Sequence, residues 1–242
     1  MMIFEKNNKK WSEKNIIFND KWIEENIIYL TNHGSVAYGT NTPTSDHDIR
    51  GICICPKEYY FGFNKNFEQA QLKEPDVVIF EIRKFLKLAA KANPNFLEIL
   101  FVNNDDILII NKLGKKILDN RNLFLSKEIK HTMMGYAAHN LKKIKKDKPI
   151  DYKDVYHLVR LIRMTKEALL TGKLNVKRSD KKELLEIKNG SWSYDKIISY
   201  AIKEESEINK IYSNCTILPE KANIEKINTL CIEIIEEFYT KK

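Results

Sequence analysis

The chain has 242 residues, of which 43% are hydrophobic, enough for one large domain or two small ones. No stretch approaches eighteen consecutive apolar residues, and the Lys-rich opening segment has no apolar core, so we expect neither a membrane span nor a signal peptide. Four cysteines without a C-x-x-C pair predict reduced thiols. These features exclude a disulfide scaffold and favour a cytoplasmic protein.

The positive charge is concentrated in one part of the chain. The formal net charge is +8, yet residues 127–182 carry 16 Lys or Arg against 6 Asp or Glu, a net of +10 that leaves −2 for the remainder. A concentrated basic face attracts polyanions such as RNA, DNA or nucleotide phosphates. The alternative is a solvated, Lys-rich surface with no ligand.

The first half of the chain alternates between helical and strand patterns. In chain order, the residue patterns predict a helix towards the end of residues 11–28, a strand at 27–31, a short helix at 35–38, a loop of turn-forming residues at 40–45 and a strand at 46–55 that Pro56 ends. A β-branched strand at 76–80, a helix from 82 to about 93 and at least one further helix within 95–125 follow.

Beyond residue 128 the strand signals disappear. Long helical patterns are broken near Lys148-Pro149, at Gly172 and at Leu218-Pro219. We therefore predict two closely packed units, a catalytic core at 1–127 and a helical domain with a basic face at 128–242.

A Gly-Ser turn and two aspartates carry the chemistry of the first half. Gly34 lets the backbone approach a phosphate closely, and Ser35 offers a hydroxyl and an N–H at a helix N-terminus, where anions are favoured. Asp46 and Asp48 are two apart on an expected strand, so both carboxylates project from one face. Clustered carboxylates repel each other and favour a hard cation such as Mg²⁺.

Clustered carboxylates of this kind can hold two divalent ions, Mg²⁺ or Mn²⁺, and a third acid usually completes such a site. One ion activates the attacking hydroxyl and the other holds the triphosphate and the leaving pyrophosphate. Asp76, at the head of the next strand, is the candidate third ligand, and Glu81 is the alternative.

The same residues resemble a known family. Gly34-Ser35 followed by Asp46-His47-Asp48-Ile49 is similar to the signature of the DNA polymerase beta nucleotidyltransferase superfamily. The longer motifs at 34–40 and 45–51 resemble the YcgL-like, RNA-ligase-associated group of predicted nucleotidyltransferases. Further similar stretches at 83–88, 93–100, 157–161 and 170–174 extend the resemblance over most of the chain.

The resemblance implies an α+β fold, with a polymerase beta-like mixed-sheet core and a C-terminal helical domain. It also implies a bound nucleoside triphosphate, ATP among the candidates, and metal-dependent transfer of its nucleotidyl group. Association of the group with RNA ligases suggests RNA ends as acceptors. Within the matching motifs, Tyr38 and Ser45 join Gly34 and Ser35 as expected nucleotide-binding residues.

Three further residues are candidates for nucleotide contacts. Arg50 contacts triphosphate or, equally, forms a salt bridge with a neighbouring acid. His157 lies in an apolar helix, where a core histidine is the commoner outcome. Arg160, one turn from His157, is a candidate phosphate clamp.

The leading prediction is a magnesium-dependent enzyme that moves a nucleoside monophosphate from a triphosphate to an acceptor, an RNA end, with release of pyrophosphate. One alternative is a non-catalytic sensor of nucleotide or RNA. Another is an enzyme of toxin-antitoxin type that modifies a protein or tRNA. The sequence leaves the preferred nucleotide and the oligomeric state open.

Overall fold

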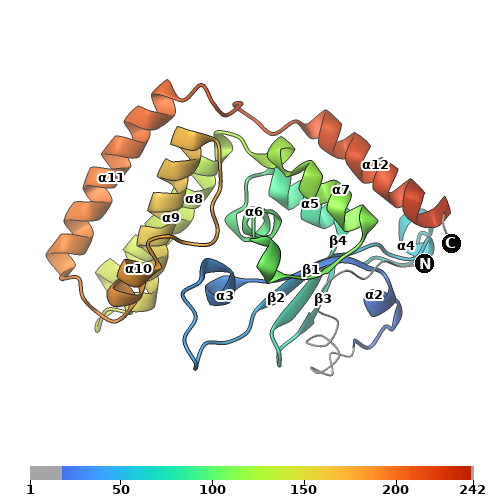
Figure 1. The fold of residues 1–242 in the computed structure, drawn as a ribbon, viewed down its shortest axis with the longest axis horizontal. Helices are drawn as coiled ribbons and strands as arrows, with labels where there is room; N and C mark the ends of the chain where they lie inside the picture. The colour runs from blue at the N-terminus through green and yellow to red at the C-terminus, as the bar shows by residue number, and fades with distance from the viewer. Residues whose placement is uncertain (1–17, 241–242) are drawn as a thin grey trace.

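The computed structural model describes residues 18–240, and their five strands form one mixed sheet in the order β3-β4-β2-β1-β5 (Figure 1). Strand β2 pairs in parallel with β4, and the other neighbours are antiparallel. The strands are β1 (Ile27–Asn32), β2 (Ile49–Cys53), β3 (Gln69–Leu72), β4 (Val77–Glu81) and β5 (Ile107–Ile110).

Short helices connect the strands. They are α2 (Trp22–Glu25), α3 (Gly34–Tyr38), α4 (Glu58–Phe61), α5 (Ile82–Ala90), α6 (Pro94–Leu100) and α7 (Lys112–Asp119), with 3₁₀ turns η1 (Asn104–Asp106) and η2 (Arg121–Phe124). Side chains fix several starts: Asn93 accepts from the N–H of Asn95 before α6, and Asn111 accepts from two N–H groups of α7. Helices α5, α6 and α7 cover one face of the sheet (Figure 1).

Five helices follow, and no strand occurs between residues 128 and 240, as the sequence predicts. They are α8 (Glu128–Lys146), α9 (Tyr152–Thr171), α10 (Lys181–Lys188), α11 (Tyr194–Asn214) and α12 (Ile224–Thr240). Asp151 caps the start of α9, and Gly172, at a φ of 67°, ends it in the left-handed conformation.

The sheet is buried on both faces. One face joins a core that continues through α5–α12, and the other packs in a smaller cluster with Phe18 and with Ile23 of α2. Helix α12 returns from the second half to pack against α5 and α7 (Figure 1). The boundary proposed between residues 127 and 128 stays a prediction. Helix α12 bears on it, because α12 comes after that boundary in the chain but packs against helices that come before it.

The α+β class with a mixed sheet is confirmed, and so are the strands at 27–31 and 76–80. The expected strand at 46–55 begins only at Ile49, so Asp46 and Asp48 lie in the extended segment before β2. Strands β3 and β5 were not expected from the sequence. Of the expected N-terminal helix, the described residues contain only the four-residue α2, because residues 18–21 are not helical and β1 begins at Ile27. The part of that helix before residue 18, and the segment expected to lack a signal peptide, lie outside the described residues. No helix within 18–240 combines the length and apolar character needed to cross a bilayer.

Candidate active site

The turn between β1 and α3 is held in a conformation that favours glycine. Gly34 has a φ of 59°, a left-handed value that costs a side-chain-bearing residue about 1–2 kcal/mol. A Cβ built on Gly34 would overlap Oδ2 of Asp48. Position 34 therefore needs glycine for two reasons. Its backbone is left-handed, and the Asp48 carboxylate occupies the space that a Cβ would fill.

We expect Gly34→Ala to lower the thermal midpoint, because the new methyl group displaces the Asp48 carboxylate and the left-handed backbone strains a residue with a side chain. Gly135→Ala in α8 is the matched control: its Cβ meets nothing within 4 Å, and alanine raises helix propensity there. An unchanged midpoint in the Gly34 variant would contradict the packing of the Asp48 carboxylate against this turn.

Sheet pairing brings Asp76 beside Asp48. The parallel register of β2 and β4 places Ile49 opposite Val77, so the residues that precede them are neighbours. Two backbone bonds fix the arrangement: the N–H of His33 donates to the Asp48 carbonyl at 2.8 Å, and that of Ile49 donates to the Asp76 carbonyl at 2.8 Å. The sheet itself therefore sets the distance between the two carboxylates.

Arg50 compensates this pair of acids. Its guanidinium donates to Oδ2 of Asp76 at 2.9 Å and lies 3.8 Å from Oδ1 of Asp48. Burial, and then the hydrogen bond with Asp76, raise the pKa of Asp48. Burial also acts upward on the pKa of Asp76, but hydrogen bonding and charge attraction from Arg50 outweigh it and lower that pKa. The sequence allows Arg50 either to contact triphosphate or to form a salt bridge with a neighbouring acid, and the structure shows the salt bridge.

The pair fits a hard cation. Oδ1 of Asp76 is buried without a hydrogen-bond partner among the described residues, and the two carboxyl groups are close enough to share a hydrogen bond. A cation between them would give Oδ1 of Asp76 a partner and would reduce the repulsion between the two carboxylates. Asp46 is exposed and stands further from the pair, and no three His, Cys, Asp or Glu side chains within residues 18–240 form a ready-made metal cluster. The arrangement is a pair of adjacent carboxylates with Asp46 lining the same cavities.

Two cavities meet at Asp46 and Asp48. The first, of about 360 Å³, is lined by seven of the residues singled out from the sequence: Gly34, Ser35, Tyr38, Ser45, Asp46, Asp48 and His157. The second, of about 540 Å³, lies on the side of Asp76 and is also lined by Gln71 and Lys73. Residues far apart in the chain, from α3, the 40–45 loop and α9, thus share one pocket.

Side chains of the helical half line the first cavity. Lys153 and His157, one turn apart on α9, and Lys188 of α10 line it opposite the Gly34 turn. Neither lysine was singled out from the sequence. The four-residue spacing of Lys153 and His157 was a usable signal, whereas Lys188 is brought in by tertiary packing alone.

Two histidines in this pocket are neutral at physiological pH. Burial is the main cause that lowers the pKa of His33 and of His157, each to about 4. For His157 the nearby guanidinium of Arg160 adds to the effect. His157 thus enters the pocket as a neutral hydrogen-bonding group.

This shift of His157 predicts a dependence of stability on pH. Between pH 6.5 and 4 the unfolded chain takes up a proton at His157 that the folded chain refuses, so stability falls as the pH is lowered. We expect His157→Gln to remove about 2 kcal/mol of the stability lost between pH 7 and pH 4. Urea unfolding at both pH values measures this difference, and parallel losses in the two proteins would exclude a depressed pKa.

Arg160 is not placed as a phosphate clamp. Its guanidinium is buried, donates to Oε1 of Glu98 at 2.6 Å and stacks with its Cζ 3.8 Å from the centroid of the Tyr38 ring. The Tyr38 hydroxyl donates to the other oxygen of Glu98. The expected clamp is therefore a buried structural pair beneath α3, and Tyr38 reaches the pocket while its hydroxyl points into this pair.

Glu81 is separated from the other acids. It ends β4, five residues after Asp76, which at about 3.3 Å per strand residue puts it roughly 16 Å away. There it caps α5 through the N–H of Lys84 and accepts from the Tyr60 hydroxyl at 2.9 Å. Glu81 is therefore too far away to bind the same metal ion as Asp48, and the prediction of Glu81 as the alternative third ligand is wrong. Asp76 is the acid beside Asp48.

Comparison with known proteins places the chain in a family. The model of RlaP, the RNA repair pathway DNA polymerase beta family, matches residues 10–175, which include the two cavities' acids and the α3 turn. The chain belongs to this family. Membership supports a nucleotidyltransferase-like protein associated with RNA repair, in agreement with the resemblance inferred from the motifs.

Individual relatives are more distant. The chain is 27% identical over 149 residues to the uncharacterized protein YcgL of Bacillus subtilis (strain 168), a match that covers 60% of this chain and 47% of YcgL. The chain thus spans about half the length of that relative. The crystal structure of a nucleotidyltransferase-like protein from Exiguobacterium sibiricum 255-15 is 11% identical, with a TM-score of 0.28 over 91% of this chain and 72% of that one.

Proposed function

We propose that the protein transfers a nucleoside monophosphate from a nucleoside triphosphate to an acceptor hydroxyl or phosphate, with release of pyrophosphate. The observation that carries the proposal is the contact of the Asp48 carboxylate with both Asp76 and the Gly34 turn. It puts the acidic pair at the boundary between two cavities, where one holds the donor and the other the acceptor.

The donor triphosphate fits the first cavity. Gly34 and Ser35 present backbone and hydroxyl groups, while Lys153 and Lys188 supply positive charge from the opposite wall. Negative charge of the triphosphate is thereby balanced by residues of both halves of the chain. Binding of the donor should accordingly stabilise their contact.

Asp48 and Asp76, with Asp46 beside them, would hold Mg²⁺ or Mn²⁺. When bound, such an ion lowers the pKa of an attacking hydroxyl and stabilises charge on the triphosphate. The chain's own contribution is positional, since the sheet register fixes the acids and Gly34 leaves room for Asp48. Arg50 balances the negative charge of the pair at 2.9 Å from Asp76.

RNA is the acceptor that the charge distribution favours. Lys142, Lys145 and Lys146 near the end of α8 make no ion pair with any described residue. That end of α8 lies at the same end of the helical half as α10 (Figure 1). Lys153 and Lys188 extend from this region into the donor cavity. A phosphate backbone approaching it would meet several lysine ammonium groups.

The test is pyrophosphate release with Mg²⁺ or Mn²⁺ and each of the four nucleoside triphosphates, with and without total RNA. We expect release that depends on RNA and one preferred triphosphate, and that disappears in Asp46→Asn. Release with protein extract in place of RNA would reassign the acceptor to a protein. Triphosphate binding without pyrophosphate release, under every condition, would overturn the proposal that the protein is an enzyme.

One observation favours a second candidate, the non-catalytic sensor. Arg50 already neutralises part of the Asp48–Asp76 pair, which reduces its attraction for a cation. A sensor would bind triphosphate with equal affinity in the presence and absence of Mg²⁺. Isothermal titration of the triphosphate with and without Mg²⁺ separates the two candidates.

A further inference from the structure

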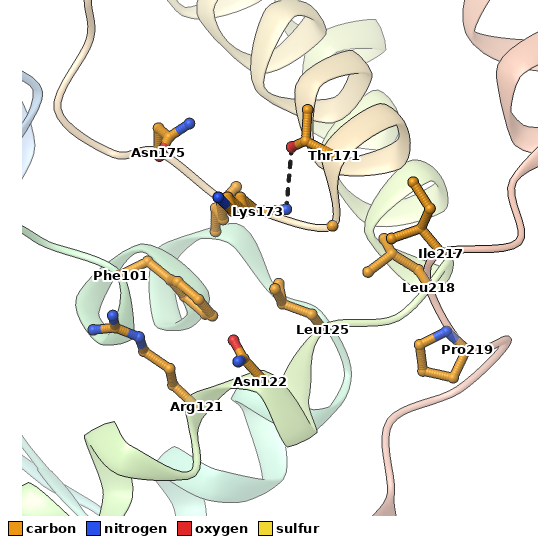
Figure 2. A pocket seen from close by; sticks show the side chains of 12 residues that line it. Phe101, Arg121, Asn122, Leu125, Thr171, Lys173, Asn175, Ile217, Leu218 and Pro219 are labelled. Carbon is orange, nitrogen blue, oxygen red and sulfur yellow. Dashed lines mark hydrogen bonds between the residues drawn. The ribbon is translucent and has the colours of Figure 1, made fainter.

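A groove separate from the Gly34 turn lies where loops from both halves of the chain meet. One cavity of about 510 Å³ is bounded by η2, the segment 171–175 and the segment 217–219 (Figure 2). An adjoining cavity of about 500 Å³ shares four lining residues with it: Phe101, Arg121, Leu174 and Asn175. We call the two together the η2 groove.

Two cations of the η2 groove have no charged partner among the described residues. The guanidinium of Arg121 lies 5.4 Å from the centroid of the Phe101 ring and, within residues 18–240, makes neither a hydrogen bond nor an ion pair. The ammonium group of Lys173 likewise has no partner in the part of the chain that the structure describes. Such cations over a floor of buried Leu125 and Leu174 suit a ligand with phosphates and flat apolar faces.

Three amides with no side-chain hydrogen bond to the described residues line the two cavities of the groove. The side chains of Asn103, Asn104 and Asn122 are exposed and make no hydrogen bond within the described chain. Amides present a donor and an acceptor together, the pattern that recognises edges of unpaired bases. Each cavity has the volume of a small-molecule site, so the pair accommodates successive nucleotides better than one.

The same connecting segment reaches both sites. Lys173 lines the η2 groove, whereas five residues later the N–H of Arg178 donates to the carbonyl of Tyr38 at 3.0 Å. Along α9, from His157 to Thr171, the two sites are about 21 Å apart at 1.5 Å per residue. A strand with its end in the catalytic pocket is long enough to reach the groove after a few nucleotides.

We propose that the η2 groove binds an unpaired segment of RNA, using Arg121 and Lys173 for phosphates and the Phe101 ring and the asparagines for bases. The inference rests on the proposed function only in that this RNA is the acceptor strand. Binding here fixes the strand, while the reactive end remains free to enter the acidic site.

The test measures binding without donor triphosphate, in the Asp48→Asn background, so that it is independent of transfer. Fluorescence anisotropy with a labelled single-stranded 12-nucleotide RNA should give a Kd raised about tenfold by Arg121→Gln/Lys173→Gln. The control Lys203→Gln/Lys210→Gln removes the same charge from exposed positions on α11 and should change the Kd less than about twofold. Circular dichroism melting verifies that both variants fold.

Crosslinking locates the contact. RNA carrying 4-thiouridine should crosslink to the peptide that contains Phe101, and the Arg121→Gln/Lys173→Gln variant should lose that product. Equal Kd values for the two double variants, duplex RNA bound as tightly as single-stranded RNA, or crosslinks confined to α8–α10 would each overturn the groove. If RNA binding depends on the groove but the wild type releases no pyrophosphate, the proposed transfer activity is wrong. The proposal that the η2 groove binds RNA would still hold.

Discussion

Asp48→Asn should reduce pyrophosphate release by about a thousandfold or more while leaving the fold intact. The carboxylate of Asp48 touches both Asp76 and the Gly34 turn, so it is the side chain through which an ion and the donor would be aligned. Loss of one negative ligand removes several kcal/mol of transition-state stabilisation, and about 4 kcal/mol corresponds to a thousandfold in rate. Single-turnover release of labelled pyrophosphate measures the effect.

Stability should move the other way in this variant. The Asp48 carboxylate carries a desolvation cost and is repelled by Asp76, so a neutral amide of the same shape should hold or raise the thermal midpoint. Asp20→Asn, an exposed acid outside both cavities, is the control and should change neither rate nor midpoint. A rate within tenfold of the wild type would remove Asp48 from the chemistry, whereas a collapsed melting transition would make it a folding residue.

Local sequence was sufficient for the centre of the site. The β-branched runs at 27–31 and 76–80 predict β1 and β4, and a glycine followed by a helix start locates the turn at Gly34. Placing Asp76 near Asp48 required only that both precede neighbouring strands. These features depend on residues a few positions apart, for which periodicity and turn chemistry are good guides.

Features that depend on tertiary pairing were not predictable in the same way. The run Ile107–Ile110 is too short to distinguish strand from helix until its partner β1 is known. Strand β3 is an edge strand of only four residues, and its Gln-Ala-Gln-Leu alternation is too short to indicate a strand before its partner β4 is known. Arg160 occupies a helical position from which a cavity and a buried acid are both within reach, and the acid, Glu98, lies 62 residues earlier in the chain.

The buried pair of Glu98 and Arg160 decides between two interpretations of Arg160. If Arg160 is a phosphate clamp, Arg160→Met raises the KM for triphosphate with little change in stability. The structure predicts instead a large loss of stability, with the KM changed only through displacement of Tyr38 and α3. Removing the guanidinium leaves the buried carboxylate of Glu98 without its partner, so the free energy of unfolding should fall by about 3–5 kcal/mol. Urea unfolding of the two proteins measures the difference.

The double variant Glu98→Gln/Arg160→Met completes the experiment. It removes both charges at once, so most of the stability lost in Arg160→Met should return, and the amide introduced at position 98 retains an acceptor for the Tyr38 hydroxyl. Because Tyr38 belongs to α3, the recovered packing should also restore the Gly34 turn and with it the KM for triphosphate. Recovery of stability without recovery of the KM would indicate that Arg160 contacts the phosphates of the bound triphosphate. Recovery of both would establish that the helical half acts on the catalytic turn through a buried support beneath it.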